Sequence, residues 1–536
     1  MLFDMGMEVL TMLISKATSE HIFSPLVGCS ALQRVSLYAD DVVMFVKPAL
    51  VDLIGVRDML GIFGEASGLR INYRKSTAIL IRGEAVEEAM VTDIMRCKID
   101  QFPVKYLGMQ LALRPLTKPE WQPLIDQVID CLPAWQRGLI ARQGRLVLIK
   151  SVVAARPIHQ LLVADAPVWV LEEIEAWCRA FFWTGKDKVK GGQCMVAWSK
   201  VSKPYEFGGL GVKGLRLQGL ALRVRWEWLR RTDNTRPWQG LPVLKDDRAR
   251  AVFDSLVKIQ LGRGDIIRFW TDRWIDGKSV NDIAPAILQL VPVRTRKRRT
   301  VQEALVDNRW TLDMVGELPL EGFVQCVELC AAILQVERNI EEEDLFTWPC
   351  SSSGQYTAGS TYERLCQGGE RFATSVCIWK AKAPLKCKIF QWLGIRWRLW
   401  TTDRRARHGL QDAPSACFVC LQELDSVEHI LVQCSYAREV WHQSFREAGL
   451  PDLTPTRDDE LENWWLRVRV RFRGKEQRQF DSRIILTCWL LWKHRNARAF
   501  NNVALFASVP ELVSRIREEA NLWEVAGVGV PLRIGE

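Results

Sequence analysis

Apolar residues recur every three or four positions in several parts of the chain. In one such stretch they are Leu53, Val56, Leu60 and Phe63. This spacing predicts an amphipathic helix, and Gly68 can end it because glycine readily adopts the left-handed conformation of a C-cap. The same period predicts further helices at 8–17, 121–132, 144–155 and 220–231, and over most of 455–536.

Other stretches are typical of strands. Residues 35–46 predict a hairpin with its turn at 39–41, and 69–80 and 104–111 also have strand character. Helix, hairpin, helix and hairpin in succession predict an α+β unit over 1–115. Because helical patterns dominate afterwards, we expect an α+β, multidomain, helix-rich chain.

Changes in composition suggest how the chain is divided. From its length of 536 residues we expect roughly three to five domains. The basic, proline-containing run at 291–300 predicts a linker, and the acidic residues at 341–344 lead into a compact region. The expected regions are 1–115, 116–235, 236–340 (a connector with the basic linker), 341–450 and 451–536.

The charge balance is basic, with 73 Lys and Arg against 63 Asp and Glu, a net charge of +10. This favours a polyanionic partner, although it is also compatible with plain solubility. The 23 tryptophans are an unusual number, and we expect most of them to be packing residues.

The sequence argues against secretion and membrane insertion. The apolar opening segment lacks a basic region and is interrupted by Asp4 and Glu8. The most apolar late stretch, 484–492, is far too short to span a bilayer. We therefore expect an intracellular protein with no membrane partner, in which clusters among the 15 cysteines indicate metal rather than disulfides.

Asp40 and Asp41 stand side by side in an apolar setting. Adjacent residues of a strand point to opposite faces, so two such carboxylates share a site only at a turn. The pair suits Mg²⁺, which takes one or two protein carboxylates together with phosphate oxygens of a substrate. A turn that merely reaches water is the alternative, and the two residues alone leave both interpretations open.

The segment 417–434 carries a compact set of soft ligands, namely Cys417, Cys420, His429 and Cys434. Three thiolates and one imidazole form a complete tetrahedral set for structural Zn²⁺, with no open position for catalysis. The C-x2-C pair predicts a knuckle turn, and His429 and Cys434 are expected roughly one turn apart on the following helix. The alternative is buried free thiols beside a surface histidine.

Basic residues cluster near this segment. Arg404, Arg405 and Arg407 precede the knuckle, where they could contact phosphates of a nucleic acid. The run at 291–300 could bind nucleic acid or act as a nuclear-import signal, from which we predict a nuclear location. A solvated surface is the alternative for each of these clusters.

Several segments together resemble a known family. Tyr38-Ala39-Asp40-Asp41 with its apolar flanks resembles motif C of reverse transcriptases. Later segments, in the expected order, resemble parts of the plant non-LTR (LINE-type) enzymes: the helix-plus-lysine motif D, the primer-grip hairpin, the thumb helices and the zinc-binding region. They are 59–76, 102–111, 132–159 and 417–434.

This resemblance implies a fold and a set of roles. It implies a partial reverse-transcriptase palm at 1–115 (the end of motif B through the primer grip), a helical thumb-like region at 116–235, a zinc-binding domain at 341–450 and a helical tail at 451–536. Asp40 and Asp41 would be catalytic Mg²⁺ ligands. The implied substrate-binding residues are Tyr38, Lys75, Lys105, Tyr106 and Gly108.

The resemblance also implies a missing part. Residues 1–14 resemble the interior of motif B, so the fingers and motif A, with its third metal-binding aspartate, would precede Met1. We therefore expect a chain that is N-terminally truncated and inactive as a polymerase.

Three functions remain compatible with these features. The first is an RNA-directed DNA polymerase that binds an RNA/DNA template-primer and, if active, deoxynucleoside triphosphates as its only small-molecule substrates. The second is a non-catalytic, zinc-containing nucleic-acid-binding protein. The third is an inert relic of a retroelement.

Overall fold

The computed structural model describes residues 2–26, 34–81, 83, 85–132, 137–233, 235–236, 238, 246–501 and 508–527. Helices form most of it and strands little, which confirms the α+β, multidomain, helix-rich prediction. The chain folds into two compact units, each built from two segments. Unit 1 combines Met1–Leu124 with Arg223–Tyr356, and unit 2 combines Ile125–Leu222 with Thr357–Glu536.

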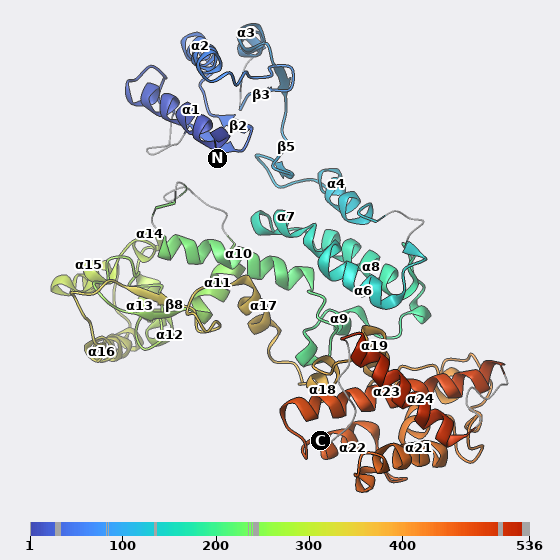
Figure 1. Ribbon diagram of the computed structural model, residues 1–536. Coiled ribbons are helices and arrows are strands. Elements are labelled where there is room, and N and C mark those ends of the chain that lie inside the picture. Colours follow the sequence, from blue (N-terminus) through green and yellow to red (C-terminus); the bar gives the residue numbers. More distant parts are fainter. Residues whose placement is uncertain are drawn as a thin grey trace. The chain divides into compact units, whose positions relative to one another are not determined.

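The first segment of unit 1 mixes helices with short strands (Figure 1). Its elements, the last of which continues into unit 2, are α1 (Leu2–Ser19), β1 (Val35–Tyr38), β2 (Asp41–Met44), α2 (Leu50–Ser67), β3 (Thr77–Ile79), α3 (Ala85–Met95), β4 (Lys98–Asp100), β5 (Val104–Tyr106), β6 (Met109–Leu111) and α4 (Lys118–Ile129). The strands pair two by two, with β1–β2 and β5–β6 antiparallel and β3–β4 parallel.

The hairpin predicted at 35–46 is present as β1 and β2. Tyr38 pairs with Asp41 across a two-residue turn formed by Ala39 and Asp40. Ala39 has a φ of 53°, and a positive φ at the first turn residue lets so short a turn follow the twist of its strands. The turn leaves both aspartates exposed at the tip of the hairpin.

Local backbone bonds explain where helix and strand end. Gly68 ends α2 with a φ of 76°, and its N–H donates to the Gly64 carbonyl at 3.0 Å. Most of the stretch 69–80 is not a strand, because the Asn72 carbonyl accepts hydrogen bonds from the N–H groups of Lys75 and Ser76, both at 3.0 Å. These bonds form a turn, so only β3 remains as a strand.

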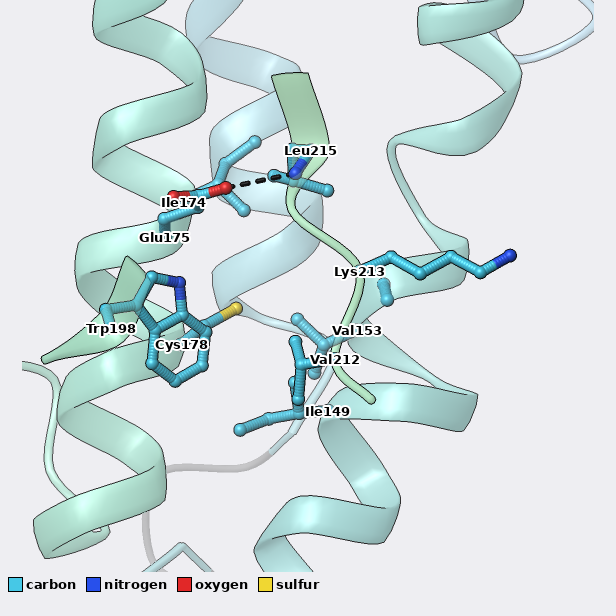
Figure 2. A pocket seen from close by; sticks show the side chains of 10 residues that line it. Ile149, Val153, Ile174, Glu175, Cys178, Trp198, Val212, Lys213 and Leu215 are labelled. Atoms are coloured by element: carbon cyan, nitrogen blue, oxygen red, sulfur yellow. Dashed lines mark hydrogen bonds between the residues drawn. The ribbon is translucent and has the colours of Figure 1, made fainter. Parts of the chain in front are cut away.

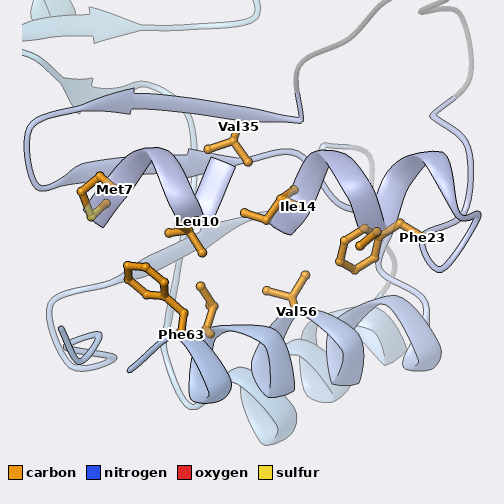
Figure 3. Packing of buried hydrophobic residues seen from close by; sticks show 9 residues of the cluster. Met7, Leu10, Ile14, Phe23, Val35, Val56 and Phe63 are labelled. Carbon is orange, nitrogen blue, oxygen red and sulfur yellow. The ribbon is translucent and has the colours of Figure 1, made fainter. Parts of the chain in front are cut away.

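Helices α1 and α2 enclose an apolar core together with β1 (Figure 3). Leu10 and Ile14 of α1 contribute to this core from one side, and Val56 and Phe63 of α2 from another, with Val35 of β1 beside them. The apolar period of α2 that is visible in the sequence therefore faces the core, as expected for an amphipathic helix.

The second segment of unit 1 is largely helical. Its elements are α11 (Asp247–Leu256), β7 (Lys258–Gln260), α12 (Val280–Ile283), α13 (Pro285–Leu290), α14 (Val293–Arg296), α15 (Val301–Leu305), α16 (Leu320–Leu334) and β8 (Leu345–Thr347). Strands β7 and β8 pair antiparallel. The basic run 291–300, expected to be a linker, contains α14, and its Arg299 forms an ion pair with the buried Asp313.

The regular elements of unit 2 in its described part are helices, joined by turns and loops. Its elements are α6 (Arg142–Ser151), α7 (Ile158–Val163), α8 (Val168–Thr184), α9 (Trp198–Val201), α10 (Leu215–Thr232, which continues into unit 1), α17 (Ala358–Cys366), α18 (Ser375–Trp379), α19 (Leu385–Ile395), α20 (Thr402–Arg407), α21 (Ser435–Arg446), α22 (Leu461–Arg469), α23 (Gly474–Asn501) and α24 (Val509–Val525). The thumb-like segment predicted at 132–159 includes 133–136, which lie outside the described residues.

Unit 2 contains a small cavity between α6, α8 and the segment that leads into α10 (Figure 2). Its volume is about 10 Å³, room for about one water molecule. Glu175 borders it and accepts a hydrogen bond from the Leu215 N–H at 3.0 Å, and burial raises the pKa of Glu175. The cavity is too small for a substrate or cofactor.

No helix in the described part of the chain is both long enough and apolar enough to cross a membrane.

We predict that the core between α1 and α2 contributes strongly to the stability of unit 1. Leu10 is 1% exposed, so Leu10→Ala should lower the free energy of unfolding by about 2–5 kcal/mol through lost burial and a residual cavity. The neighbouring Val9 is half exposed, and Val9→Ala should change it by less than about 0.5 kcal/mol. Hydrogen exchange of peptides from α1 and α2 measures the loss of stability in each variant. Equal protection in the two variants would contradict the importance of this core.

Candidate metal centre

The four predicted zinc ligands lie together in unit 2. The ligand atoms of Cys417, Cys420, His429 and Cys434 are all within 4.8 Å of one another. Sγ of Cys420 and Nε2 of His429 are 3.1 Å apart. With Zn–S bonds of about 2.3 Å and Zn–N bonds of about 2.0 Å, a tetrahedral site holds its ligand atoms roughly 3.5–3.8 Å apart. The side chains therefore form a constellation that can close around one ion.

The first two ligands lie on a tight turn. An isolated bridge between Ala416 and Leu424 closes its base, and the Cys417 N–H donates to the Glu423 carbonyl at 2.7 Å. The Val419 N–H points at the Cys417 sulfur, 3.4 Å away, as in a knuckle that presents thiolates to a metal. Leu421 has a φ of 60° and returns the chain. The knuckle predicted from C-x2-C is thus present in the backbone.

The other two ligands come from a widened helical turn. Residues His429–Gln433 form a π-helical turn, in which the Cys434 N–H donates to the His429 carbonyl at 2.7 Å. In an α-helix, two side chains five positions apart, as His429 and Cys434 are, would point in directions that differ by roughly 140° around the axis. The wider turn, closed from residue i to i+5, brings them to one side, and π-turns are frequent at functional sites. The sequence predicted a helical turn here but not its type.

A carboxylate orients the histidine. Nδ1 of His429 lies 3.2 Å from Glu423 Oε2, and Arg457 donates to Glu423 Oε1 at 2.5 Å. With the proton on Nδ1, the imidazole donates to Glu423 and its Nε2 lone pair faces Cys420 and the site. Metal-bound histidines commonly have such a partner, which fixes ring orientation and tautomer.

Hydrogen bonds among the four ligand side chains shift their pKa values. The bond with Cys434, followed by that with His429, lowers the pKa of Cys417, while the bond with Cys417 and burial raise that of Cys434. Burial opposes the charge of His429, but hydrogen bonds to Cys417 and Cys420 outweigh it and raise its pKa to about 9. A metal replaces these protons, so its affinity falls as pH falls.

The knuckle is attached to α23 by a buried ion pair. Asp425 accepts from Nε of Arg495 at 2.9 Å and also from Nη2, and the Thr402 N–H donates to the same carboxylate at 2.9 Å. The Arg495 guanidinium lies 5.1 Å from the ring centroid of Phe418, the residue after the first cysteine ligand. Both charged side chains are almost completely buried. Arg495 thus contacts the knuckle at two places, Asp425 and Phe418.

The residues predicted for catalysis belong to unit 1, whereas the four zinc ligands belong to unit 2. Asp40 and Asp41 are exposed at the hairpin tip, next to Tyr38, which is 65% exposed. Within the described residues, the zinc constellation is the only group of three or more His, Cys, Asp or Glu side chains placed to hold an ion. The two aspartates alone do not form a site for two Mg²⁺ ions.

The predicted substrate-binding residues are all near the surface. Lys75 follows the Asn72 turn, Lys105 is exposed on β5, and Gly108 lies in the β5–β6 turn with a φ of 80°. Tyr106 connects the two hairpins, because its hydroxyl lies 3.4 Å from Ser36 Oγ on β1. No hydrogen bond or ion pair within the described residues joins Lys75 or Lys105 to the aspartates.

The three arginines before the knuckle differ in environment. Arg404 is 4% exposed, lies over the Trp400 ring and donates to the Arg398 carbonyl. Arg407 is exposed but forms an ion pair with Asp403 at 2.6 Å, and Arg405 is half-buried. Arg404 therefore supports the packing of α20, and the role of all three as phosphate contacts stays a prediction.

Sequence reasoning missed the residues that support the ligands. Glu423 and Asp425 lie within the ligand segment 417–434, so their position between the ligands was a signal that could have found them. Arg495 and Arg457 lie far along the chain, and nothing in their local sequence links them to the knuckle.

Comparisons with known proteins agree with this site. Residues 356–441, which include all four ligands, match the profile of the family described as zinc-binding in reverse transcriptase. Together with the Cys3His constellation, this match supports structural zinc.

Two curated relatives extend beyond this region. The chain is 25% identical over 367 residues to an Arabidopsis thaliana protein named "Putative ribonuclease H protein", covering 62% of the chain and 57% of the relative. It is 27% identical over 195 residues to the uncharacterized 149 kDa protein of transposon TX1 from Xenopus laevis, covering 36% of the chain and 14% of the relative. The chain thus spans less than two thirds of either relative. These matches support a reverse-transcriptase-related, retrotransposon-derived protein.

We predict that the purified chain carries one zinc ion at this centre. Cys417→Ser should lose it, whereas Glu423→Gln should keep the four ligands but weaken zinc binding about 10- to 100-fold, because His429 loses its orienting carboxylate. Competition with a chromophoric chelator measures the affinity. Glu447→Gln, which removes an exposed partner of Arg517, is the matched control and should bind zinc normally. Full zinc content in Cys417→Ser would contradict the ligand assignment.

We also predict that Asp425 is a major source of stability in unit 2. Asp425→Asn leaves the buried Arg495 without a charged partner, which should cost about 3–5 kcal/mol. The exposed pair Asp452–Arg471 offers the control, since Asp452→Asn should cost less than about 1 kcal/mol. Denaturant unfolding of the zinc-loaded protein, followed by tryptophan fluorescence, tests the difference; similar losses in both variants would rule out this role.

Proposed function

We propose that this relative of transposable-element proteins is part of a plant LINE-type reverse transcriptase, and that it holds an RNA/DNA template-primer in the nucleus. Its zinc centre would be structural and would support a surface that binds nucleic acid. Asp40 and Asp41 would be remnants of, or contributors to, a polymerase site.

The zinc centre carries this proposal. Its four ligands lie in a region that matches the zinc-binding region of reverse transcriptases. In the same chain, the segments that resemble motif C, motif D, the primer grip and the thumb precede it in the order of that enzyme family. The exposed Asp40–Asp41 hairpin tip and the Ser36–Tyr106 contact between the two hairpins fit a palm with an adjacent primer grip.

Polymerase chemistry would need more than this chain's described residues provide. In two-metal nucleotidyl transfer, carboxylates hold ions that activate the attacking hydroxyl and stabilise the leaving group. No third carboxylate joins Asp40 and Asp41 within the described residues. We therefore propose that the chain alone binds template-primer without extending it. Deoxynucleoside triphosphates would be substrates only if another carboxylate completed the site.

A non-catalytic zinc-containing nucleic-acid-binding protein is the second candidate. The closed Cys3His set favours it, because such a site stabilises a fold but offers no position for a substrate. The two candidates share the binding surface and differ in polymerisation, which primer extension with Mg²⁺ separates. An inert relic would show neither.

We predict salt-dependent, sequence-independent binding of an RNA/DNA hybrid through the thumb-like region. Exposed lysines that form no ion pair within the described residues lie between α8 and α9: Lys186, Lys188 and Lys190. Changing all three to Glu should weaken binding at least tenfold and reduce the slope of log K against log salt by about 2–3, as expected for three lost phosphate contacts. Fluorescence anisotropy at several salt concentrations measures both quantities.

The matched control places the same charge change on three exposed lysines elsewhere, which are Lys258, Lys278 and Lys475. This variant should lose less affinity and keep the slope nearly unchanged. Equal losses in the two triple variants would indicate a general charge effect and contradict a localised surface. Primer extension by the unmodified chain that is lost in Asp40→Ala would instead show that the site is complete.

A further inference from the structure

Helix α16 in unit 1 has an exposed apolar face, which we call the α16 face. Its large side chains are between 52% and 86% exposed. They are Leu320, Phe323, Val324, Val327 and Leu334. At 100° per residue these positions, with Cys330 and Ala331, fall within about one third of the helix circumference. They form a continuous stripe rather than scattered surface residues.

The opposite side of α16 already has its packing partners. Gly322 and Leu329 are buried, and Gln325 accepts a hydrogen bond from the Ala286 N–H of α13 at 2.8 Å. Helix α16 therefore has two apolar sides, and only one of them packs against other described residues of the chain. A helix that is apolar all round is normally buried, and contiguous exposed apolar surface of this kind marks an interaction site.

The surroundings of the α16 face are acidic. Residues 314–343 contain seven glutamates and one arginine, in a chain whose net charge is +10. We call these glutamates the acidic rim. All are exposed, and none forms an ion pair within the described residues. They are Glu317, Glu321, Glu328, Glu337, Glu341, Glu342 and Glu343.

Charge selects the occupant of this face. Glu321 and Glu328 are seven residues apart, two turns of the helix, so they lie along the same edge of the α16 face. A second copy of the chain would bring its own acidic rim against this one, which is unfavourable. A partner with apolar residues at helical spacing and Lys or Arg beside them would fill the stripe and pair with the rim.

We propose that the α16 face is a docking site for a basic amphipathic helix of another polypeptide. The apolar stripe supplies the contact surface, and the acidic rim selects for positive charge. This proposal does not depend on nucleic-acid binding or on polymerase activity.

Cys330 provides an independent reporter of occupancy. It lies within the α16 face and is the only cysteine of the described residues whose side chain is exposed. A helix docked on the face would cover its thiol. Protection of Cys330 from alkylation by iodoacetamide, read by mass spectrometry, therefore reports binding at this position rather than elsewhere on the protein.

Two designed helical peptides test the proposal on the full chain. Both carry leucines at the same helical spacing, with lysine and arginine beside them in one peptide and glutamate in the other. Fluorescence anisotropy should show the basic peptide binding at least tenfold more tightly, with a preference that weakens as salt rises. It should also slow alkylation of Cys330. Failure of the basic peptide to bind, or equal binding of both peptides, overturns the proposal.

Variants locate the site and test its charge logic. Val327→Glu should weaken binding of the basic peptide at least tenfold, whereas Val86→Glu, a matched change at an exposed valine of α3, should not. Glu321→Lys with Glu328→Lys should reverse the preference towards the acidic peptide. Unchanged binding in Val327→Glu overturns the site. A dimer seen by light scattering that Val327→Glu abolishes would make a second copy the occupant and also overturns it.

Discussion

The zinc region depends on one buried ion pair, between Asp425 in the knuckle and Arg495 in α23. Two charges removed from water are tolerated only when geometry and further hydrogen bonds compensate their desolvation. Here Arg495 binds the carboxylate through two nitrogens, the Thr402 N–H adds a third donor, and Phe418 covers the guanidinium. The pair thereby fixes a loop with little regular structure to the longest described helix, 70 residues away in sequence.

The metal ligands make use of this fixed backbone. Cys417 and Cys420 lie on the knuckle, and His429 and Cys434 lie on a π-turn, so that two unlike turns converge on one point. A hydrogen bond between the two thiols lowers the pKa of Cys417 and raises that of Cys434. A closed four-ligand set then contributes to folding rather than to catalysis. The chemistry of the centre is therefore the chemistry of a structural support.

The two carboxylates of the N-terminal hairpin are in a contrasting situation. They are held by a well-defined two-residue turn, yet they are exposed and no third ligand of the described residues accompanies them. A well-defined turn is thus not enough for metal catalysis, because a two-metal site needs carboxylates from separate helices or strands to lie close together. Arg404 shows a similar difference between local sequence and environment. Its position before the knuckle suggested phosphate binding, but its side chain is buried against Trp400.

The sequence by itself determined what is local. The apolar period from Leu53 to Phe63 predicted α2, and Gly68 predicted its end. The strand-like stretch 35–46 predicted the first hairpin, and the Cys/His spacing predicted the four side chains that converge. Each of these features depends on residues that are close together in the sequence. Tertiary structure alone decided the pairing of Asp425 with Arg495, the orienting of His429 by Glu423 and Arg457, and the burial of Arg404. These depend on packing between segments distant in sequence, and an arginine carries no local mark of whether it will meet solvent, an aromatic ring or a buried carboxylate.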